Sequence, residues 1–262
     1  MSPIAEALEQ VQARIRQACQ AQGLPEQSVR LMAVSKTFGA DAVLQAIEAG
    51  QRDFGENYVQ EGVDKIQVVA QALGQTAAHA TKPSQPCWHF IGPLQSNKTK
   101  DVAEHFDWVH SIDRLKIAQR LLDQRPKHLG PLQVCLQVNT SGEESKSGVP
   151  PHQALELAAQ VAKLIADHPR GQSAMVLRGL MTIPEPSQDP AITVGRFQRL
   201  VQLRDEIKQA LSGTGQDQDF DVLSMGMSAD LELAIAASVA EATTWVRVGT
   251  AIFGARPAKT KT

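Results

Sequence analysis

A lysine follows directly on a short apolar run near the start of the sequence. Lys36 comes after residues 31–35, whose order Leu-Met-Ala-Val-Ser is typical of a buried strand. At the edge of an apolar sheet, desolvation lowers the pKa of a lysine and frees its amine to attack a carbonyl group. Schiff-base formation is therefore the chemistry that Lys36 suggests. The alternative is a surface lysine that begins a loop, which is the more common situation.

Two segments in the last sixth of the sequence combine small and hydroxyl residues. Residues 224–228 are Ser-Met-Gly-Met-Ser, and residues 249–254 are Gly-Thr-Ala-Ile-Phe-Gly. Small residues let backbone amides approach an anion, and Ser and Thr hydroxyls donate further hydrogen bonds. Together the two segments predict a phosphate-binding site.

Two further polar residues stand at the ends of apolar runs. Arg247 lies between Val246 and Val248, and a buried guanidinium needs an acceptor. That acceptor is either a ligand or a carboxylate, for which Glu56 and Glu232 are the candidates, and the residues alone do not decide between them. Asn57 offers both a donor and an acceptor to a ligand, but it also suits a helix N-cap.

The elements that must position these residues alternate between strands and helices. After an opening amphipathic helix over residues 1–22, eight strands are predicted at 29–35, 53–55, 87–92, 107–112, 132–139, 175–183, 222–227 and 245–253. Helices are predicted between them at 40–49, 58–73, 97–105, 113–123, 151–167, 192–211 and 229–241. This pattern predicts a single-domain (β/α)₈ TIM barrel over residues 1–262, with the opening helix filling the place on the outer ring that follows the last strand.

The barrel gives the site residues a common location. Active sites of such barrels lie at the carboxyl ends of the strands, and phosphate is often held after strands seven and eight, where residues 224–228 and 249–254 fall. Residues 74–86 are predicted to form a flexible surface insertion and residues 258–262 a flexible tail.

Composition excludes several other classes of protein. The 262 residues carry 26 basic and 28 acidic side chains. This near-neutral balance gives no positive electrostatic field that would attract nucleic acid. No apolar stretch is long enough to span a membrane, and the first residues lack the core of a signal peptide. The three cysteines are too widely spaced for a disulfide framework or a zinc site built on Cys-x-x-Cys pairs. We therefore expect a cytoplasmic protein.

A lysine for an aldehyde, a phosphate site and an arginine for a ring nitrogen together match pyridoxal 5′-phosphate (PLP). Because Arg247 only donates hydrogen bonds, it would keep the pyridine nitrogen unprotonated. An unprotonated ring is a weaker electron sink, which disfavours carbanion chemistry.

Six segments closely resemble the pyridoxal phosphate homeostasis protein family. They are residues 33–36, 54–61, 88–98, 179–181, 223–228 and 246–254. The resemblance implies a barrel related to the N-terminal domain of alanine racemase, with the aldimine at Lys36. It also implies a pyridine-nitrogen contact from Arg247, a ring-side contact from Asn57 and a lining role for Met225. Phosphate contacts are implied for Ser224, Ser228, Gly249 and Thr250.

The resemblance further implies a carrier or buffer of PLP rather than an enzyme, with PLP-requiring apoenzymes as partners. Racemases of this kind use a second catalytic base from another domain, and we expect none here, since the single tyrosine, Tyr58, would have to act unaided. A racemase-like enzyme that uses Lys36 as its acid and base is the alternative. A Schiff-base aldolase without coenzyme and a pure interaction module with residues 74–86 as its docking loop are further alternatives. No apolar stripe requires a dimer, so we expect a monomer.

Overall fold

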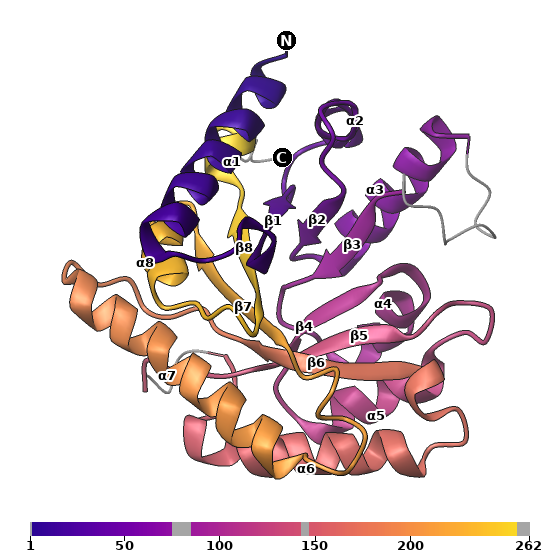
Figure 1. Ribbon diagram of the computed structural model, residues 1–262. Coiled ribbons are helices and arrows are strands. Elements are labelled where there is room, and N and C mark those ends of the chain that lie inside the picture. Colours follow the sequence, from indigo (N-terminus) through magenta and orange to yellow (C-terminus); the bar gives the residue numbers. More distant parts are fainter. Residues whose placement is uncertain (1, 75–84, 143–146, 256–262) are drawn as a thin grey trace.

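Eight parallel strands close into one barrel in the computed structural model, which describes residues 2–74, 85–142 and 147–255. Each strand pairs with its sequence neighbours, and β1 closes the barrel by pairing with β8 from Val29↔Thr244 to Ala33↔Val248. The predicted (β/α)₈ barrel is confirmed (Figure 1). The strands are β1 Val29–Val34, β2 Asp53–Glu56, β3 Cys87–Phe90, β4 Trp108–Ile112, β5 Leu132–Gln137, β6 Met175–Met181, β7 Val222–Met227 and β8 Thr243–Val248.

Helices surround the barrel as an outer ring (Figure 1). They are α1 Pro3–Gln22, α2 Ala40–Glu48, α3 Val59–Ala72, α4 Thr99–His105, α5 Leu115–Gln124, α6 Pro151–Asp167, α7 Pro190–Ala210, α8 Leu231–Ala236 and α9 Thr250–Phe253. Short 3₁₀ turns cover Glu26–Ser28, Ser96–Lys98 and Gly171–Ser173. Within the described residues, no helix combines the length and apolar character needed to cross a membrane.

The opening helix takes the place predicted for it. The hydroxyl of Ser2 accepts a hydrogen bond from the Ala5 amide and caps α1, and Gly23 ends the helix in the left-handed conformation at φ 64°. The buried stripe of α1 consists of Leu8, Val11, Ile15 and Cys19. It packs against α8, α9 and α2, so α1 lies beside the last strand unit and completes the ring.

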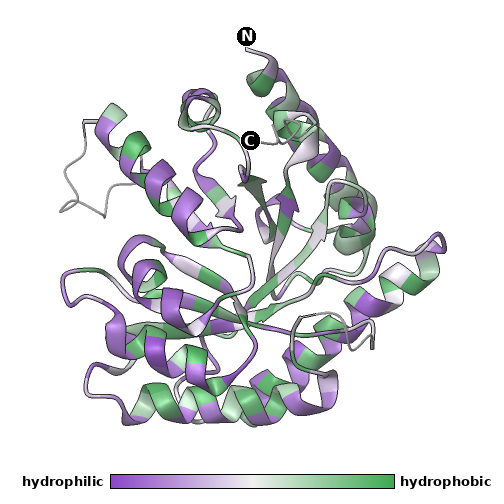
Figure 2. Cartoon of the chain, turned by 180° about the vertical axis from the view of Figure 1, so that it is seen from behind, coloured by the Kyte–Doolittle hydropathy of each residue, from purple (hydrophilic) through white to green (hydrophobic). Residues whose placement is uncertain are grey.

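The core has two layers. The larger layer lies between the outer face of the sheet and the helices, whose apolar faces turn inward while their polar faces turn outward (Figure 2). The smaller layer fills the barrel itself with Met32, Val34, Ile91, Trp108, Cys135, Met181, Val222 and Trp245. Because this inner layer is packed with side chains, the barrel is a solid support for its rims rather than a pore.

Two predicted elements differ from the structure. The last strand ends at Val248 and not at 253, because Gly249 leaves the strand conformation with φ −116° and ψ −70° and Thr250–Phe253 form α9. The predicted helix 229–241 is shorter, from Leu231 to Ala236. Most of the predicted insertion, residues 75–84, and the predicted tail, residues 258–262, lie outside the described residues.

Candidate cofactor site

Lys36 lies in a turn whose backbone is held on both sides by α3. The turn follows β1 directly, and Lys36 is half-buried there. On one side, Lys65 Nζ donates to the Ser35 carbonyl at 2.8 Å; on the other, the Thr37 amide donates to Glu61 Oε1 at 2.5 Å. Thr37 has φ 70°, a left-handed conformation that a β-branched residue adopts only when its surroundings impose it. The position of the Lys36 backbone is therefore fixed by the fold.

A buried ion pair supports this turn from behind. Lys65 Nζ lies 2.5 Å from Glu56 Oε1, with the two side chains 4% and 0% exposed. The hydroxyl of Ser35 donates to the same oxygen at 2.6 Å. Burial raises the pKa of the Glu56 carboxyl, and the charge of Lys65 opposes that rise. The ion pair thus connects α3 to the ends of β1 and β2.

The sequence analysis missed this pair, although a signal for it exists. Lys65 shares the buried face of α3 with Gly62 and Val69, at steps of three and four residues. It also stands four residues after Glu61, a spacing that brings the two side chains together on one helix. A lysine on the apolar stripe of a helix indicates a buried partner.

Arg247 is a buried cation whose hydrogen bonds, within the described residues, go to neutral groups. It is 3% exposed, and its Nη1 donates to Ser224 Oγ at 2.8 Å while Nη2 donates to the Thr182 carbonyl at 2.8 Å. The predicted alternative of an ion pair is wrong, because Glu56 pairs with Lys65 and Glu232 pairs with Arg14. Burial lowers the pKa of the Arg247 guanidinium to about 10, so the group stays charged at neutral pH. The Asp230 carboxylate opposes this lowering of the pKa without a hydrogen bond to Arg247 among the described residues, and a buried cation of this kind is suited to a ligand acceptor.

The carboxyl-terminal part of β7 contains a bulge. Gly226 has φ 85°, and the register between β7 and β8 shifts here. Met225 is fully buried before the bulge, and the Met227 amide after it donates to Asp230 Oδ1 at 2.6 Å. Ser228 follows, half-buried. Ser224 differs from the other predicted phosphate contacts because it lies within β7, fully buried, with its hydroxyl engaged by Arg247.

The segment after β8 lies against the turn of Lys36. A Cβ added to Gly249 would come within 3.1 Å of the Val34 carbonyl, so the end of β8 passes close to the end of β1. Thr250 begins α9, and the ring of Phe253 in that helix packs against Phe38 in a tilted arrangement, with the centroids 5.3 Å apart. The predicted phosphate segment and the predicted Schiff-base lysine are therefore neighbours in space.

Asn57 is not the helix cap that its residue type allows. Tyr58 occupies the N-cap position of α3, and the buried Oδ1 atom of Asn57 has no hydrogen-bond partner among the residues that the structure describes. A Cβ at Gly92 would lie 2.0 Å from the Asn57 carbonyl oxygen, so the ends of β2 and β3 meet too closely for any residue but glycine. An unpaired buried amide oxygen needs a partner from outside the chain.

All eight predicted site residues lie at one end of the barrel. They belong to the carboxyl ends of β7, β8, β1 and β2, which are consecutive in the closed sheet, or to the segments just after them. The carbonyl of Thr182 joins them as an acceptor for Arg247, and sequence analysis could not find it because every residue has such a carbonyl. These groups fit a ligand that carries a carbonyl, an anion and a ring acceptor. Lys36 is the half-buried lysine, Arg247 the buried cation with neutral hydrogen-bond partners, and Asn57 the source of the amide oxygen that lacks a partner among the described residues.

Comparison with known proteins defines the class first. A family model described as alanine racemase, N-terminal domain, matches residues 7–257. An alanine racemase of Clostridium difficile 630 has a similar structure, with a TM-score of 0.62 over 94% of this chain and 57% of the racemase. At 14% sequence identity this likeness concerns the fold alone.

Relatives of higher identity define the family within that class. The chain is 52% identical to the pyridoxal phosphate homeostasis protein of Pseudomonas aeruginosa, over 98% of this chain and 97% of that protein. It is 36% identical to PipY of Synechococcus elongatus PCC7942, solved with PLP bound, with a TM-score of 0.71 over 96% of this chain and all of PipY. The chain belongs to the pyridoxal phosphate homeostasis protein family.

Proposed function

We propose that this protein binds PLP through a Schiff base at Lys36 and serves as an intracellular carrier and buffer of the coenzyme. The observation that carries the proposal is the buried charge of Arg247, which bonds to neutral acceptors and lies on the strand that pairs with β1, the strand that Lys36 follows. The name of the relatives and the PLP-bound structure of PipY support the same ligand.

Each site residue has a distinct role in this proposal. Lys36 Nζ, in its deprotonated form, bonds to the aldehyde carbon, and one water molecule leaves. Arg247 donates to the ring nitrogen, and Asn57, whose Oδ1 lacks a partner, contacts the ring from the side. Met225 lines the site. The phosphate is held by Ser224, Ser228, Gly249 and Thr250.

Arg247 also supports a carrier over an enzyme. Its permanent proton leaves the ring nitrogen unprotonated, so the coenzyme is a weak electron sink at this site. Tyr58 is 56% exposed at the start of α3, where it lacks the burial that would tune a catalytic base. A weak racemase-like activity of Lys36 is the second candidate, favoured by the racemase-type fold. We further propose that the protein acts in the cytoplasm as a monomer and passes PLP to PLP-requiring apoenzymes.

The proposal is tested by the visible absorption of the purified protein mixed with PLP. The wild type is expected to turn yellow, and borohydride followed by peptide mass analysis is expected to place the added coenzyme mass on Lys36. Lys36→Ala should lose this modification, whereas the exposed Lys163→Ala should keep it. Coenzyme mass confined to other lysines in the wild type would overturn the proposal.

A second measurement separates the carrier from the enzyme. The PLP-loaded protein is incubated with single enantiomers of amino acids, and optical activity is followed over time. The carrier predicts no loss of optical activity beyond that given by free PLP. Turnover that disappears in Lys36→Ala would instead establish the racemase-like alternative.

A further inference from the structure

The amino-terminal end of the barrel interior gathers three side chains of metal-binding type. Cys87 and His89 are two residues apart on β3, so both project into the barrel, as successive alternate residues of a strand do. Asp53 of β2 stands directly opposite Cys87 in the sheet register. Because Cys87 and Asp53 are the first residues of their strands, this group lies at the end of the barrel away from Lys36, which follows the last residue of β1.

We propose that Asp53, Cys87 and His89 bind a divalent transition metal of the zinc type. Within the described residues, one ligand atom from each of the three lies within 4.8 Å of the others, and Asp53 Oδ1 is 3.3 Å from His89 Nε2. Tetrahedral zinc with bonds of about 2.0–2.3 Å holds its ligands roughly 3.5 Å apart. The three side chains therefore need to close by up to about 1.3 Å around an ion, which side-chain rotation on fixed strands supplies.

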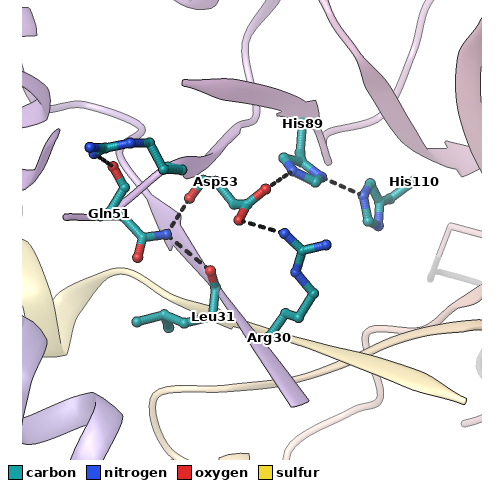
Figure 3. Close-up of polar contacts among 7 residues, drawn as sticks. Arg30, Leu31, Gln51, Asp53, His89 and His110 are labelled. Atoms are coloured by element: carbon teal, nitrogen blue, oxygen red, sulfur yellow. Dashed lines mark hydrogen bonds and ion pairs between the residues drawn. The ribbon is translucent and has the colours of Figure 1, made fainter. Parts of the chain in front are cut away.

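The surrounding contacts turn His89 Nε2 and Asp53 Oδ1 toward each other. His89 Nδ1 lies 3.0 Å from His110 Nε2, so His89 uses one ring nitrogen for the second histidine and turns Nε2 toward Asp53 (Figure 3). Metal-bound histidines in proteins are oriented by this kind of second hydrogen bond. His89 Nε2 and Asp53 Oδ1 share a hydrogen bond at 3.3 Å. A metal ion would take the place of the proton between them, and the remaining ring proton of His89 would then lie on Nδ1, directed at His110.

Asp53 is held in the same way. Arg30 Nη2 donates to Asp53 Oδ2 at 3.3 Å, which leaves Oδ1 on the side of His89. The amide of Gln51 donates to the Asp53 carbonyl at 2.7 Å and to the Leu31 carbonyl at 3.0 Å, and so connects the backbone of β2 to β1 (Figure 3). The ligands are thus placed on rigid strands with their outer atoms occupied.

The ligand set selects the class of metal. One thiolate, one imidazole and one carboxylate suit zinc or cobalt, whereas magnesium and calcium prefer oxygen ligands. On binding, the metal–sulfur bond replaces the S–H bond of Cys87, the proton goes to solvent, and no electron is transferred. Three protein ligands leave the fourth position to water, and Cys87 and Asp53 are only partly buried, so water reaches this end.

The test is a titration of the full-length protein with Co²⁺, which gives a near-ultraviolet charge-transfer band when a thiolate binds it. Each protein is compared with its own spectrum before the metal, so that bound PLP does not interfere. The wild type is expected to show the band with one equivalent of Co²⁺ and to lose it when Zn²⁺ is added. Cys87→Ser should abolish the band, and the matched control Cys19→Ser, a buried cysteine of α1, should keep it.

Two further variants keep the proposal falsifiable if Cys87→Ser does not fold. Asp53→Asn should weaken Co²⁺ binding with the band still present, and His110→Asn, which removes the ring nitrogen that contacts His89 Nδ1, should weaken it about 10–100-fold. No band in the wild type, or a band that Cys87→Ser leaves unchanged, would overturn the proposal. Lys36→Ala should bind Co²⁺ like the wild type, so this result does not depend on the proposed function.

Discussion

The two ends of the barrel treat their charged groups differently. At the amino-terminal end, Arg30 pairs with Asp53 and Arg178 pairs with Asp221. At the carboxyl-terminal end, Arg247 is buried deeper than either arginine, yet it bonds to a hydroxyl and a carbonyl. In barrels of this class, one end maintains stability and the other carries function. Arg247 illustrates this division. Burying its charge costs stability, and that cost falls at the end of the barrel where a bound ligand would supply the acceptor.

The largest effect on stability is expected at the buried ion pair of Glu56 and Lys65, which supports the turn of Lys36 at the carboxyl-terminal end of the barrel. Lys65→Met leaves Glu56 buried without its cation, which should lower the free energy of unfolding by about 3–5 kcal/mol at neutral pH. Denaturant unfolding of the PLP-free protein measures this loss. The loss should shrink as the pH falls and Glu56 becomes protonated, because the neutral carboxyl no longer needs Lys65.

The matched control for this variant is Lys163→Met. Lys163 pairs with Asp167 on the exposed face of α6, so its replacement should leave the unfolding midpoint unchanged. Equal midpoints for Lys65→Met and Lys163→Met would mean that the buried pair does not support the Lys36 turn.

A pair of arginine variants tests the contrast between the ends directly. Arg247→Met should weaken PLP binding about 10–100-fold, as expected for the loss of a hydrogen bond from a charged donor. Its stability should change less than that of Arg178→Met, because the loss of two hydrogen bonds is offset by the removal of a buried charge. Arg178→Met should instead lower stability and leave PLP affinity unchanged. It removes hydrogen bonds to Asp221, Gln133 and the Asp219 carbonyl and should cost about 1–3 kcal/mol of stability.

Both quantities are measured on each variant, PLP affinity by absorption titration and stability by denaturant unfolding. The contrast between the ends fails if Arg247→Met proves the less stable of the two, or if Arg178→Met binds PLP as weakly as Arg247→Met does.

The smallest effect is a pH dependence that originates in the barrel interior. Burial lowers the pKa of the His110 imidazole well below 6.5, and the nearby His89 and Arg247 lower it further. The folded protein therefore keeps His110 neutral, whereas the unfolded chain binds a proton there below about pH 6.5. Stability should fall as the pH drops below that value, by up to about 1.4 kcal/mol per pH unit from this group.

The contribution of His110 is isolated by comparison with His110→Gln. The slope of unfolding free energy against pH between about pH 6.5 and pH 5 should be smaller in this variant than in the wild type. His128→Gln, at an exposed position, should retain the slope of the wild type. Parallel slopes for the wild type and His110→Gln would show that His110 is not held neutral by burial.

Much of the barrel was predictable because its strands are short apolar runs between amphipathic helices. The run Ala251-Ile252-Phe253 reads as the end of a strand, because three consecutive apolar residues are too few to show the spacing of a helix. Only the backbone conformation at Gly249 shows that a helix begins there. The location of the site was predictable as well, since Lys36 and the segments after β7 and β8 follow strands that end on the same rim.

The contacts within the site were less predictable. The carbonyl of Thr182 has no signature in a sequence, and Arg247 could be assigned to a ligand or a carboxylate only once its neighbours were known. The pair of Glu56 and Lys65 joins residues nine apart through a strand end and a helix face, a relation that depends on how α3 packs.

The pairing of β1 with β8 has a consequence for biosynthesis. Residues 29–33 are synthesised 215 residues before their partners at 244–248, as the register Val29↔Thr244 gives (244 − 29). At about 5–20 residues per second, β1 waits on the order of 10–40 s with one edge open. That edge belongs to a strand of Val, Leu, Met and Val, which is prone to pair with other chains. The amount of folded protein in a cell should therefore depend on growth temperature and on chaperones more than the stability of the finished barrel suggests.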